Sequence, residues 1–155
     1  MKRNHTLVAA AGLLVAALVA AQRARAAAPY GRYTPVGVAL PGWVVDNATG
    51  LKWQQTYGGP FLNTGSPNPV TTYCGAPARL PHKRELESIV DFAATTPPAI
   101  DTATFSMPAP SGAYFATDQY IPPIVPTQFY AVDFQYGASY KATYSSTPVY
   151  VRCVQ

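Results

Sequence analysis

Proline and glycine divide this chain into short segments. The 155 residues include 16 prolines and 11 glycines, and proline-rich stretches at residues 95–99, 106–110 and 120–128 lie beside aromatic residues. Because proline removes a backbone donor and ends helices, the segments between these residues do not suit a helical bundle. Short apolar runs between turn residues are typical of strands joined by irregular loops. The sequence therefore predicts one small domain of short strands, with the proline-rich stretches as ordered surface loops.

Residues 1–26 have the layout of a secretory signal peptide. Two basic residues precede a charge-free apolar run, residues 7–21, which is too short to span a bilayer comfortably. The pattern Ala24-Arg25-Ala26 is a small-x-small cleavage site, so we expect export by the general secretory route with cleavage after Ala26. The expected protein is periplasmic or secreted, has no transmembrane segment in its mature chain, and begins with an N-terminal extension over residues 27–42.

Loss of this leader changes the charge of the chain. The formal net charge of +4 comes from 11 basic and 7 acidic residues, and four of the basic residues lie in the leader. The mature chain is therefore close to neutral, and the basic excess that often indicates nucleic-acid binding belongs to the export signal. We expect no nucleic-acid partner. Arg79, Lys83 and Arg84 are the one basic cluster left, and they are candidates for binding an anion.

Cys74 and Cys153 are the only cysteines. An exported chain meets an oxidising compartment, where two cysteines in one domain most often pair. The long loop between them would give a disulfide about 4.5 kcal/mol of stabilisation in the chain-entropy model. A reactive thiol and half of a metal site are the alternatives, although no neighbouring Cys or His has the usual ligand spacing.

Residues 42–55 alternate apolar and polar side chains on both sides of a turn sequence, residues 46–50. This pattern predicts two strands joined by a glycine-closed turn. Asn47-Ala48-Thr49 also spells a glycosylation sequon, but the same residues are common turn formers and the leader is of a bacterial type. Asp46 and Asn47 could instead suggest calcium, but the further acidic ligands of a calcium loop are missing.

Residues 82–93 are predicted to form the main helix. Leu86, Ile89, Val90 and Ala93 make one apolar stripe at helical spacing, Pro81 suits the helix entry, and the sequence TTPP ends it. Glu85 lies in the first turn, where the helix dipole favours an anion. Later alternating segments predict strands, the last of which directs Cys153 inward. These strands are expected at residues 113–120, 128–137 and 147–155.

The segments VVDNATGLKWQ, RLPHKRELESIVDF, PAIDTATF, FYAVDFQYG and YVRCVQ, in this order and spacing, resemble the Lcl C-terminal domain family, named after the collagen-like adhesin of Legionella. The resemblance covers residues 43–155. It implies an α+β, C-type-lectin-like domain with antiparallel strands, one main helix, long Pro/Tyr-rich loops and one disulfide. Cys74 and Cys153 stand where the resemblance places that bridge.

The chain also departs from its relatives. His82 occupies the helix N-cap where family members usually have Thr or Ser, and this difference is expected to cost the helix start about 0.5–1 kcal/mol. The Glu-Pro-Asn and Trp-Asn-Asp motifs of calcium-dependent lectins are missing, and so is the second cysteine of the formylglycine-generating enzymes. Neither calcium-mediated sugar binding nor that catalysis is therefore implied, and no metal or cofactor is expected.

The residue pattern also argues against an enzyme. His82 is the only histidine of the mature chain, no G-x-S-x-G turn occurs, and the acidic residues show no paired arrangement. Binding is better supported, because exposed aromatic rings can stack on sugars. Tyr136, Tyr140 and Tyr144 lie in the polar segment QYGASYKATYSS and are the candidates for exposure, although tyrosine also packs well within strands.

Three hypotheses follow from the sequence. The first is an exported, non-catalytic binding module of the bacterial cell envelope or exterior, with a glycan or a protein as its partner. The second is a structural envelope protein without a glycan ligand. The third is an enzyme distantly related to the formylglycine-generating enzymes. The sequence leaves the ligand and the oligomeric state open.

Overall fold

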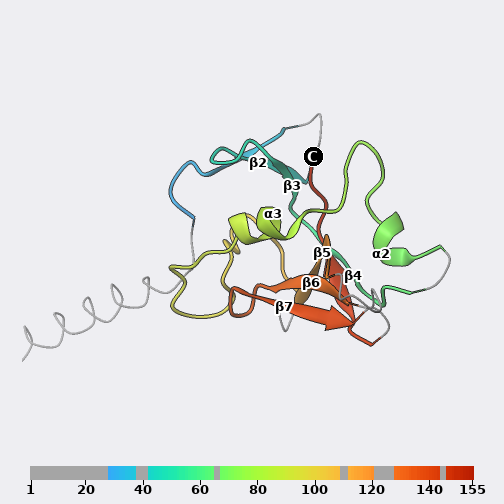
Figure 1. The fold of residues 1–155 in the computed structure, drawn as a ribbon. Coiled ribbons are helices and arrows are strands. Elements are labelled where there is room, and N and C mark those ends of the chain that lie inside the picture. Colours follow the sequence, from blue (N-terminus) through green and yellow to red (C-terminus); the bar gives the residue numbers. More distant parts are fainter. Residues whose placement is uncertain (1–27, 38–41, 65–66, 109–111, 121–127, 144–145) are drawn as a thin grey trace, which may run out of the picture.

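The computed structural model describes most of the chain after the predicted leader (Figure 1). The predicted signal peptide and Tyr144 lie outside the described residues. The described residues are 28–37, 42–64, 67–108, 112–120, 128–143 and 146–155.

Two sheets form the framework. A three-stranded sheet has the order β1-β2-β3, made of β1 (Tyr33–Pro35), β2 (Trp43–Asp46) and β3 (Lys52–Gln54). A five-stranded sheet has the order β4-β8-β5-β6-β7, made of β4 (Gly58–Phe61), β8 (Val149–Val151), β5 (Ala113–Tyr120), β6 (Gln128–Asp133) and β7 (Ala138–Thr143). All neighbouring strands are antiparallel except β5 and β8.

The hairpin predicted at residues 42–55 is confirmed as β2 and β3. The Gly50 N–H donates to the Asp46 carbonyl at 2.7 Å, and Gly50 adopts a φ of 77°, which favours glycine. The buried Asp46 carboxylate accepts hydrogen bonds from the Ala48 N–H and the Thr49 hydroxyl, so this segment is a side-chain-stabilised turn. The predicted N-terminal extension supplies β1, which pairs with β2.

The described residues contain two short helices, and the helix expected over residues 82–93 is shorter than predicted. They are α2 (Pro69–Thr72) and α3 (Lys83–Ser88). The prediction of a helix over 82–93 was too long, because the Asp91 N–H donates to the Ala99 carbonyl at 2.9 Å instead of continuing the helix. Leu86, Ile89 and Val90 of the predicted stripe are buried, whereas Ala93 is exposed.

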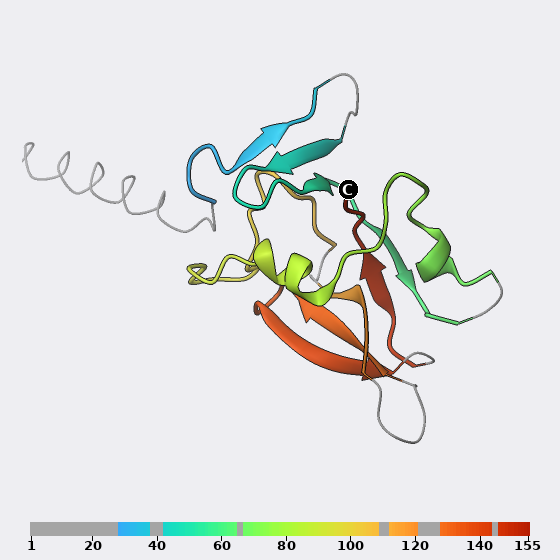
Figure 2. The same ribbon diagram turned by 45° about the horizontal axis from the view of Figure 1, so that its top comes forward.

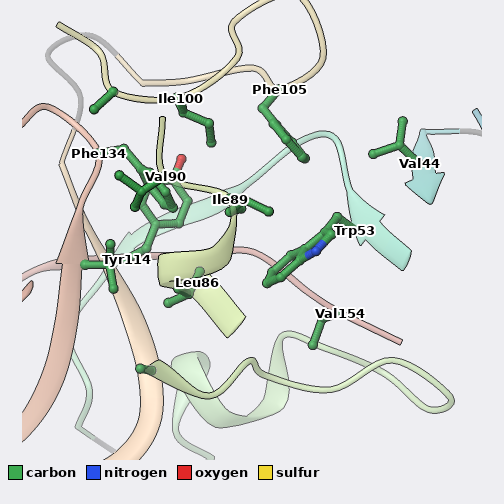
Figure 3. Close-up of a cluster of buried hydrophobic side chains, with 13 residues drawn as sticks. Val44, Trp53, Leu86, Ile89, Val90, Ile100, Phe105, Tyr114, Phe134 and Val154 are labelled. Carbon is green, nitrogen blue, oxygen red and sulfur yellow. The ribbon is translucent and has the colours of Figure 1, made fainter. Parts of the chain in front are cut away.

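The short helix α3 lies between the two sheets (Figures 1 and 2). Leu86 and Ile89 pack between Trp53 of β3 and Tyr114 of β5, and Val154 and Phe134 belong to the same buried cluster (Figure 3). Burial of such large side chains stabilises a fold by about 1.5–3 kcal/mol each. This cluster therefore joins the sheets through α3.

The opposite face of the five-stranded sheet carries a second buried cluster. Phe115, Phe129 and Ala142 come from β5, β6 and β7, and Val70 of α2 packs on them. The Asn68 side chain caps α2 by accepting from the Val70 N–H at 2.9 Å. Both faces of this sheet are thus covered, as alternating strands with two apolar faces require.

The C-terminal strand region holds the domain together by a disulfide and a buried arginine. Cys74 is bonded to Cys153, which confirms the predicted pairing. The neighbouring Arg152 is fully buried, and burial lowers its pKa. Its guanidinium donates to the carbonyls of Gln54, Gln55 and Thr56 at 2.6–3.0 Å and to the Ser106 carbonyl at 2.8 Å. One side chain just after β8 therefore contacts the end of β3, the residues that follow it, and the loop at Ser106.

Candidate functional site

The charged cluster predicted from the sequence lies at the start of α3. Arg79 makes two hydrogen bonds to the Glu85 carboxylate, at 2.8 and 2.6 Å. This contact with Arg79 lowers the pKa of Glu85. The Glu85 carboxylate also accepts from the His82 N–H at 2.7 Å, which is half of a capping box. The charge of Arg79 is therefore paired with Glu85 at the start of the helix.

Lys83 is paired in the same way. Its ammonium contacts the Glu87 carboxylate at 2.6 Å, one helical turn along, and lies 5.6 Å from the centre of the Tyr130 ring. The Ser139 hydroxyl of β7 donates to the same Glu87 oxygen at 2.6 Å. Burial raises the pKa of Glu87, but the hydrogen bonds from Lys83 and Ser139 outweigh it and lower that pKa. Of the three predicted basic residues, only Arg84 is exposed without a hydrogen bond or ion pair to the described residues.

The helix start has a cap that sequence reasoning missed. The Asp118 carboxylate of β5 accepts a hydrogen bond from the Lys83 N–H, and its other oxygen lies 3.4 Å from His82 Nδ1. His82 has no side-chain oxygen with which to cap the helix. Asp118, far along the chain, supplies a capping carboxylate instead. The local sequence carries no signal for such a cap, because β5 meets α3 only in the folded domain.

His82 contacts two residues of β5 through one ring nitrogen. Its Nδ1 lies 3.2 Å from the Thr117 hydroxyl and 3.4 Å from Asp118, so both neighbours meet the same ring nitrogen. In a hydrolytic triad the acid and the nucleophile contact opposite nitrogens of the imidazole. His82 and Asp118 line a shallow hollow together with Lys83, Arg84 and Tyr130. This arrangement fits a helix entry packed on a sheet.

A different surface forms at the other end of α3. The loop of residues 91–99 closes on itself through the Asp91–Ala99 hydrogen bond, and the Ala99 N–H donates to the Phe134 carbonyl at 2.6 Å. The turn after β6 packs against this loop at Gly137, where an added Cβ would lie 2.9 Å from Val90. Gly137 also has a φ of 68°. Glycine is therefore required here, and the loop and the turn are held together.

Aromatic side chains are exposed at this end, which we call the aromatic end (Phe92 and Tyr136, with the loop of residues 94–97). Phe92 keeps 77% of its surface exposed and Tyr136 keeps 70%. Large apolar side chains that find no cover within a domain often mark a contact surface. Sequence reasoning missed Phe92, although its place beside the apolar stripe of the predicted helix was a readable signal.

Tyr136 borders a hollow that contains no charged side chain. Its hydroxyl accepts a hydrogen bond from the Gln135 amide at 3.1 Å. The volume of the hollow, about 170 Å³, is below the roughly 300–1,000 Å³ of enclosed small-molecule sites, so an occupant would rest on the surface. The residues that line it are Ala94, Thr95, Thr96, Pro97, Ala99, Gln135 and Tyr136.

Comparison with protein-family models matches residues 42–155 to the Lcl C-terminal domain. The chain belongs to the Lcl C-terminal domain family. The matched range covers both ends of α3 and the disulfide, and it confirms the family resemblance seen in the sequence. No curated protein and no solved structure matches the chain. The relation to C-type lectins therefore stays a prediction.

Within this Lcl C-terminal domain, the predicted ligand-binding residues are separated. Tyr136 lies at the aromatic end, Tyr140 lies on β7 with 40% of its surface exposed, and the basic cluster lies at the start of α3. The structure thus brings Tyr136 to a hollow and leaves Tyr140 outside its lining. The adhesin-related family suggests a surface or secreted protein.

Two further observations concern membranes and metals. Across the part of the chain that the structure describes, no helix is both long and apolar enough to cross a membrane. Within the same residues, no three side chains of His, Cys, Asp or Glu gather where they would hold a metal ion.

Proposed function

We propose that this Lcl C-terminal domain is an exported, non-catalytic module that binds an uncharged glycan at the hollow beside Tyr136. The observation that carries the proposal is the exposed Tyr136 ring next to the Gln135 amide and the hydroxyl-bearing Thr95 and Thr96. The C–H face of a sugar ring packs on an aromatic ring, while its hydroxyls exchange hydrogen bonds with amides and hydroxyls. Both kinds of group meet at this one hollow.

The charge distribution supports an uncharged ligand. The lining of the hollow includes no lysine or arginine, which an anionic glycan would require. At the start of α3, Arg79 and Lys83 are already paired with carboxylates. Arg84 alone makes a weak polyanion site. The geometry therefore favours stacking and neutral hydrogen bonds over electrostatic capture.

The absence of catalysis is part of the same proposal. A binding module needs a surface that meets its ligand, whereas acid/base catalysis needs two titratable groups on either side of one bond. His82 and Asp118 contact each other at the helix entry, and none of the residues lining the hollow beside Tyr136 is titratable apart from the tyrosine itself. The hollow can hold a ligand without acting on it.

Export is proposed from residues 1–26, which precede the matched family range. A charge-free apolar run followed by Ala24-Arg25-Ala26 is the pattern that signal peptidase cleaves. N-terminal sequencing of the protein recovered from the periplasm and the medium should begin at Ala27. A protein that begins at Met1 in either fraction would contradict cleavage.

A glycan array tests the binding itself. The secreted, disulfide-bonded chain should retain uncharged glycans, and Tyr136→Ala should lose them because the stacking surface is removed. Tyr30→Ala is the control, since Tyr30 is also an exposed tyrosine but does not line the hollow. An array without any bound glycan would contradict the proposal and favour a structural role in the envelope.

A further inference from the structure

A pocket lies where the described chain begins, beside the end of α3 (Figures 1 and 2). Its volume is about 380 Å³, within the roughly 300–1,000 Å³ of small-molecule sites. The buried Ile89 and Val90 and the exposed Phe92 line it from α3 and the residues that follow. Ala28 of the N-terminal extension also lines it, so the pocket lies between the start of the described chain and the main helix.

The charges around this pocket are mostly negative. Asp91 and Asp101 line it, and Arg32 is the only basic residue among the described residues of its lining. Arg32 is already paired, because its guanidinium lies 3.2 Å from the buried Asp46 carboxylate and donates to the Ser88 carbonyl. The group therefore holds three carboxylates against one guanidinium. Such an excess of negative charge favours a positively charged occupant.

Asp91 is the acid best placed to meet such a cation. One of its carboxylate oxygens accepts from the Ala93 N–H at 2.9 Å, and the other accepts no hydrogen bond from the described residues. Asp101 is less available, since it is buried and its two oxygens accept from the Ala103 N–H and the Thr104 hydroxyl. Asp91 is only partly buried, so its second oxygen can accept from a donor in the pocket.

The predicted cleavage after Ala26 creates a cation next to this pocket. The mature chain then begins at Ala27, whose α-amino group is mostly protonated at neutral pH. Ala27 lies outside the described residues, but it is bonded to Ala28, so its nitrogen lies within about 5 Å of the Ala28 Cα. Because Ala28 lines the pocket, the new ammonium group is generated beside the carboxylates.

The residues that follow hold this end of the chain in place. The Arg32 N–H donates to the Pro29 carbonyl at 3.0 Å and closes a turn, and the Asn47 N–H donates to the Arg32 carbonyl at 2.8 Å. The Arg32 guanidinium also reaches the Ser88 carbonyl at the end of α3. This turn is therefore bound both to the β2–β3 hairpin and to α3, which keeps Ala28 at the pocket.

We propose that the pocket binds the α-ammonium group of Ala27, which pairs with the Asp91 carboxylate once the leader has been removed. This inference rests on the export and cleavage proposed above and does not depend on glycan binding. In the precursor the same nitrogen belongs to an uncharged peptide bond, so the ion pair exists only in the processed chain. Asp91 also closes the loop of residues 91–99, so processing fixes the new terminus to that loop.

Competitive labelling with acetic anhydride over a series of pH values tests the ion pair. The secreted, disulfide-bonded protein is labelled and digested, and mass spectrometry quantifies the acetylated N-terminal peptide. Only the deprotonated amine reacts, so the pH dependence gives the pKa of the Ala27 amine. In the wild type this pKa should lie about one unit above its ordinary value of about 7.7–8.0, which makes the amine react roughly tenfold more slowly near neutral pH.

Two asparagine variants assign the effect to one carboxylate. Asp91→Asn should return the pKa of the Ala27 amine to its ordinary range. Asp133→Asn is the matched control, because Asp133 likewise accepts from an N–H two residues on, that of Gln135 at 2.7 Å, but does not line the pocket. The Asp133→Asn protein should keep the raised pKa of the amine.

Thermal unfolding at neutral and alkaline pH gives a second readout. The part of the wild type's advantage over Asp91→Asn that comes from the ammonium should be complete below the unfolded pKa of about 7.7–8.0, and lost as the pH rises through the raised folded pKa. Burial raises the pKa of Tyr33. Burial lowers the pKa of Arg32, but the hydrogen bond with Asp46 and the neighbouring charges outweigh it and raise that pKa. Asp101 is the other acid of the lining, and carboxylic acids titrate below this range.

Three results would overturn the proposal, and the labelled peptide tells them apart. A wild type that begins at Ala27 and has an ordinary amine pKa would overturn it, and saturable binding of butylamine by that protein would assign the pocket to an external amine. A raised pKa that persists in Asp91→Asn would overturn the pairing with Asp91. A chain that begins at another residue would overturn the proposal through the cleavage site, which the first residue of the labelled peptide identifies separately.

Discussion

The two ends of α3 differ in how far their side chains are paired with, or covered by, the rest of the domain. At its start, Arg79 and Lys83 are paired with Glu85 and Glu87, and Asp118 caps the helix from a distant strand. At its other end, Phe92 and Tyr136 are exposed and the adjoining hollow carries no charge. The stretch richest in charge is therefore the structural one. A surface with unsatisfied contacts is a better candidate for binding than a surface with conspicuous charges.

The helix start belongs to a larger region, which we call the anchored region (Cys74, Arg79, the start of α3 and residues 152–154). Arg79 exchanges two backbone hydrogen bonds with Val154, each of 2.9 Å, beside the Cys74–Cys153 bond. Substitutions here should change stability, and substitutions at the aromatic end should change binding.

The largest expected effect follows from removing the disulfide. Cys74→Ser combined with Cys153→Ser opens a covalent link across a sequence separation of 79 residues. The chain-entropy model gives a loss of about 4.5 kcal/mol in the free energy of unfolding, which urea denaturation would measure. Phe92→Ala at the aromatic end should change that free energy by less than about 0.5 kcal/mol. Similar losses of unfolding free energy in the two variants would contradict the difference between the anchored region and the aromatic end.

The next effect concerns the buried Arg152. Arg152→Met keeps an apolar stem but leaves the carbonyls of Gln54, Gln55 and Ser106 without their donor. We expect a loss of about 3 kcal/mol in the free energy of unfolding. Arg84→Met is the matched control on the surface and should lie within about 0.5 kcal/mol of the wild type. A stable Arg152→Met protein would show that the buried guanidinium is dispensable.

The smallest effect is a dependence on acid at the start of α3. The hydrogen bond from Arg79 keeps the pKa of Glu85 below its usual range, so the carboxylate adds stability above the unfolded pKa of about 4.3. That contribution is lost as the pH falls through the lowered pKa in the folded state. Because both side chains are partly exposed, it should stay below about 1 kcal/mol.

Thermal unfolding from pH 7 into the acid range would measure this effect. Glu85→Gln should be less stable than the wild type at neutral pH, and the two should converge in acid as the wild-type carboxylate takes up its proton. A difference between the two proteins that is independent of pH would mean that Glu85 acts only by its shape.

Local sequence patterns predicted the start of α3 and the hairpin of β2 and β3. Pro81, Glu85 and the turn around Gly50 act within a few residues, and the ion pair of Lys83 with Glu87 could also be read from its spacing of four residues. The disulfide was predictable because the chain has only two cysteines. Such features need no knowledge of the rest of the fold.

Features that depend on distant partners were missed. The end of α3 is set by the bond between Asp91 and Ala99, and its cap comes from Asp118 of β5. The polar segment after Tyr136 was predicted only to carry exposed tyrosines, and its strand β7 was missed because it depends on pairing with β6. Tyr136 was predicted correctly as an exposed ring, whereas the hollow beside it depends on a loop some forty residues earlier in the chain.

One measurement compares the two ends of α3 directly. Glycan binding and the free energy of unfolding would be measured for the wild type, for Tyr136→Ala, and for a triple variant with Arg79→Gln, Lys83→Gln and Arg84→Gln. Tyr136→Ala should lose the bound glycan at unchanged stability, whereas the triple variant should retain the glycan and unfold slightly more easily. The opposite result would contradict glycan binding at the hollow beside Tyr136. In that case the triple variant would fold but lose the glycan, and Tyr136→Ala would keep it.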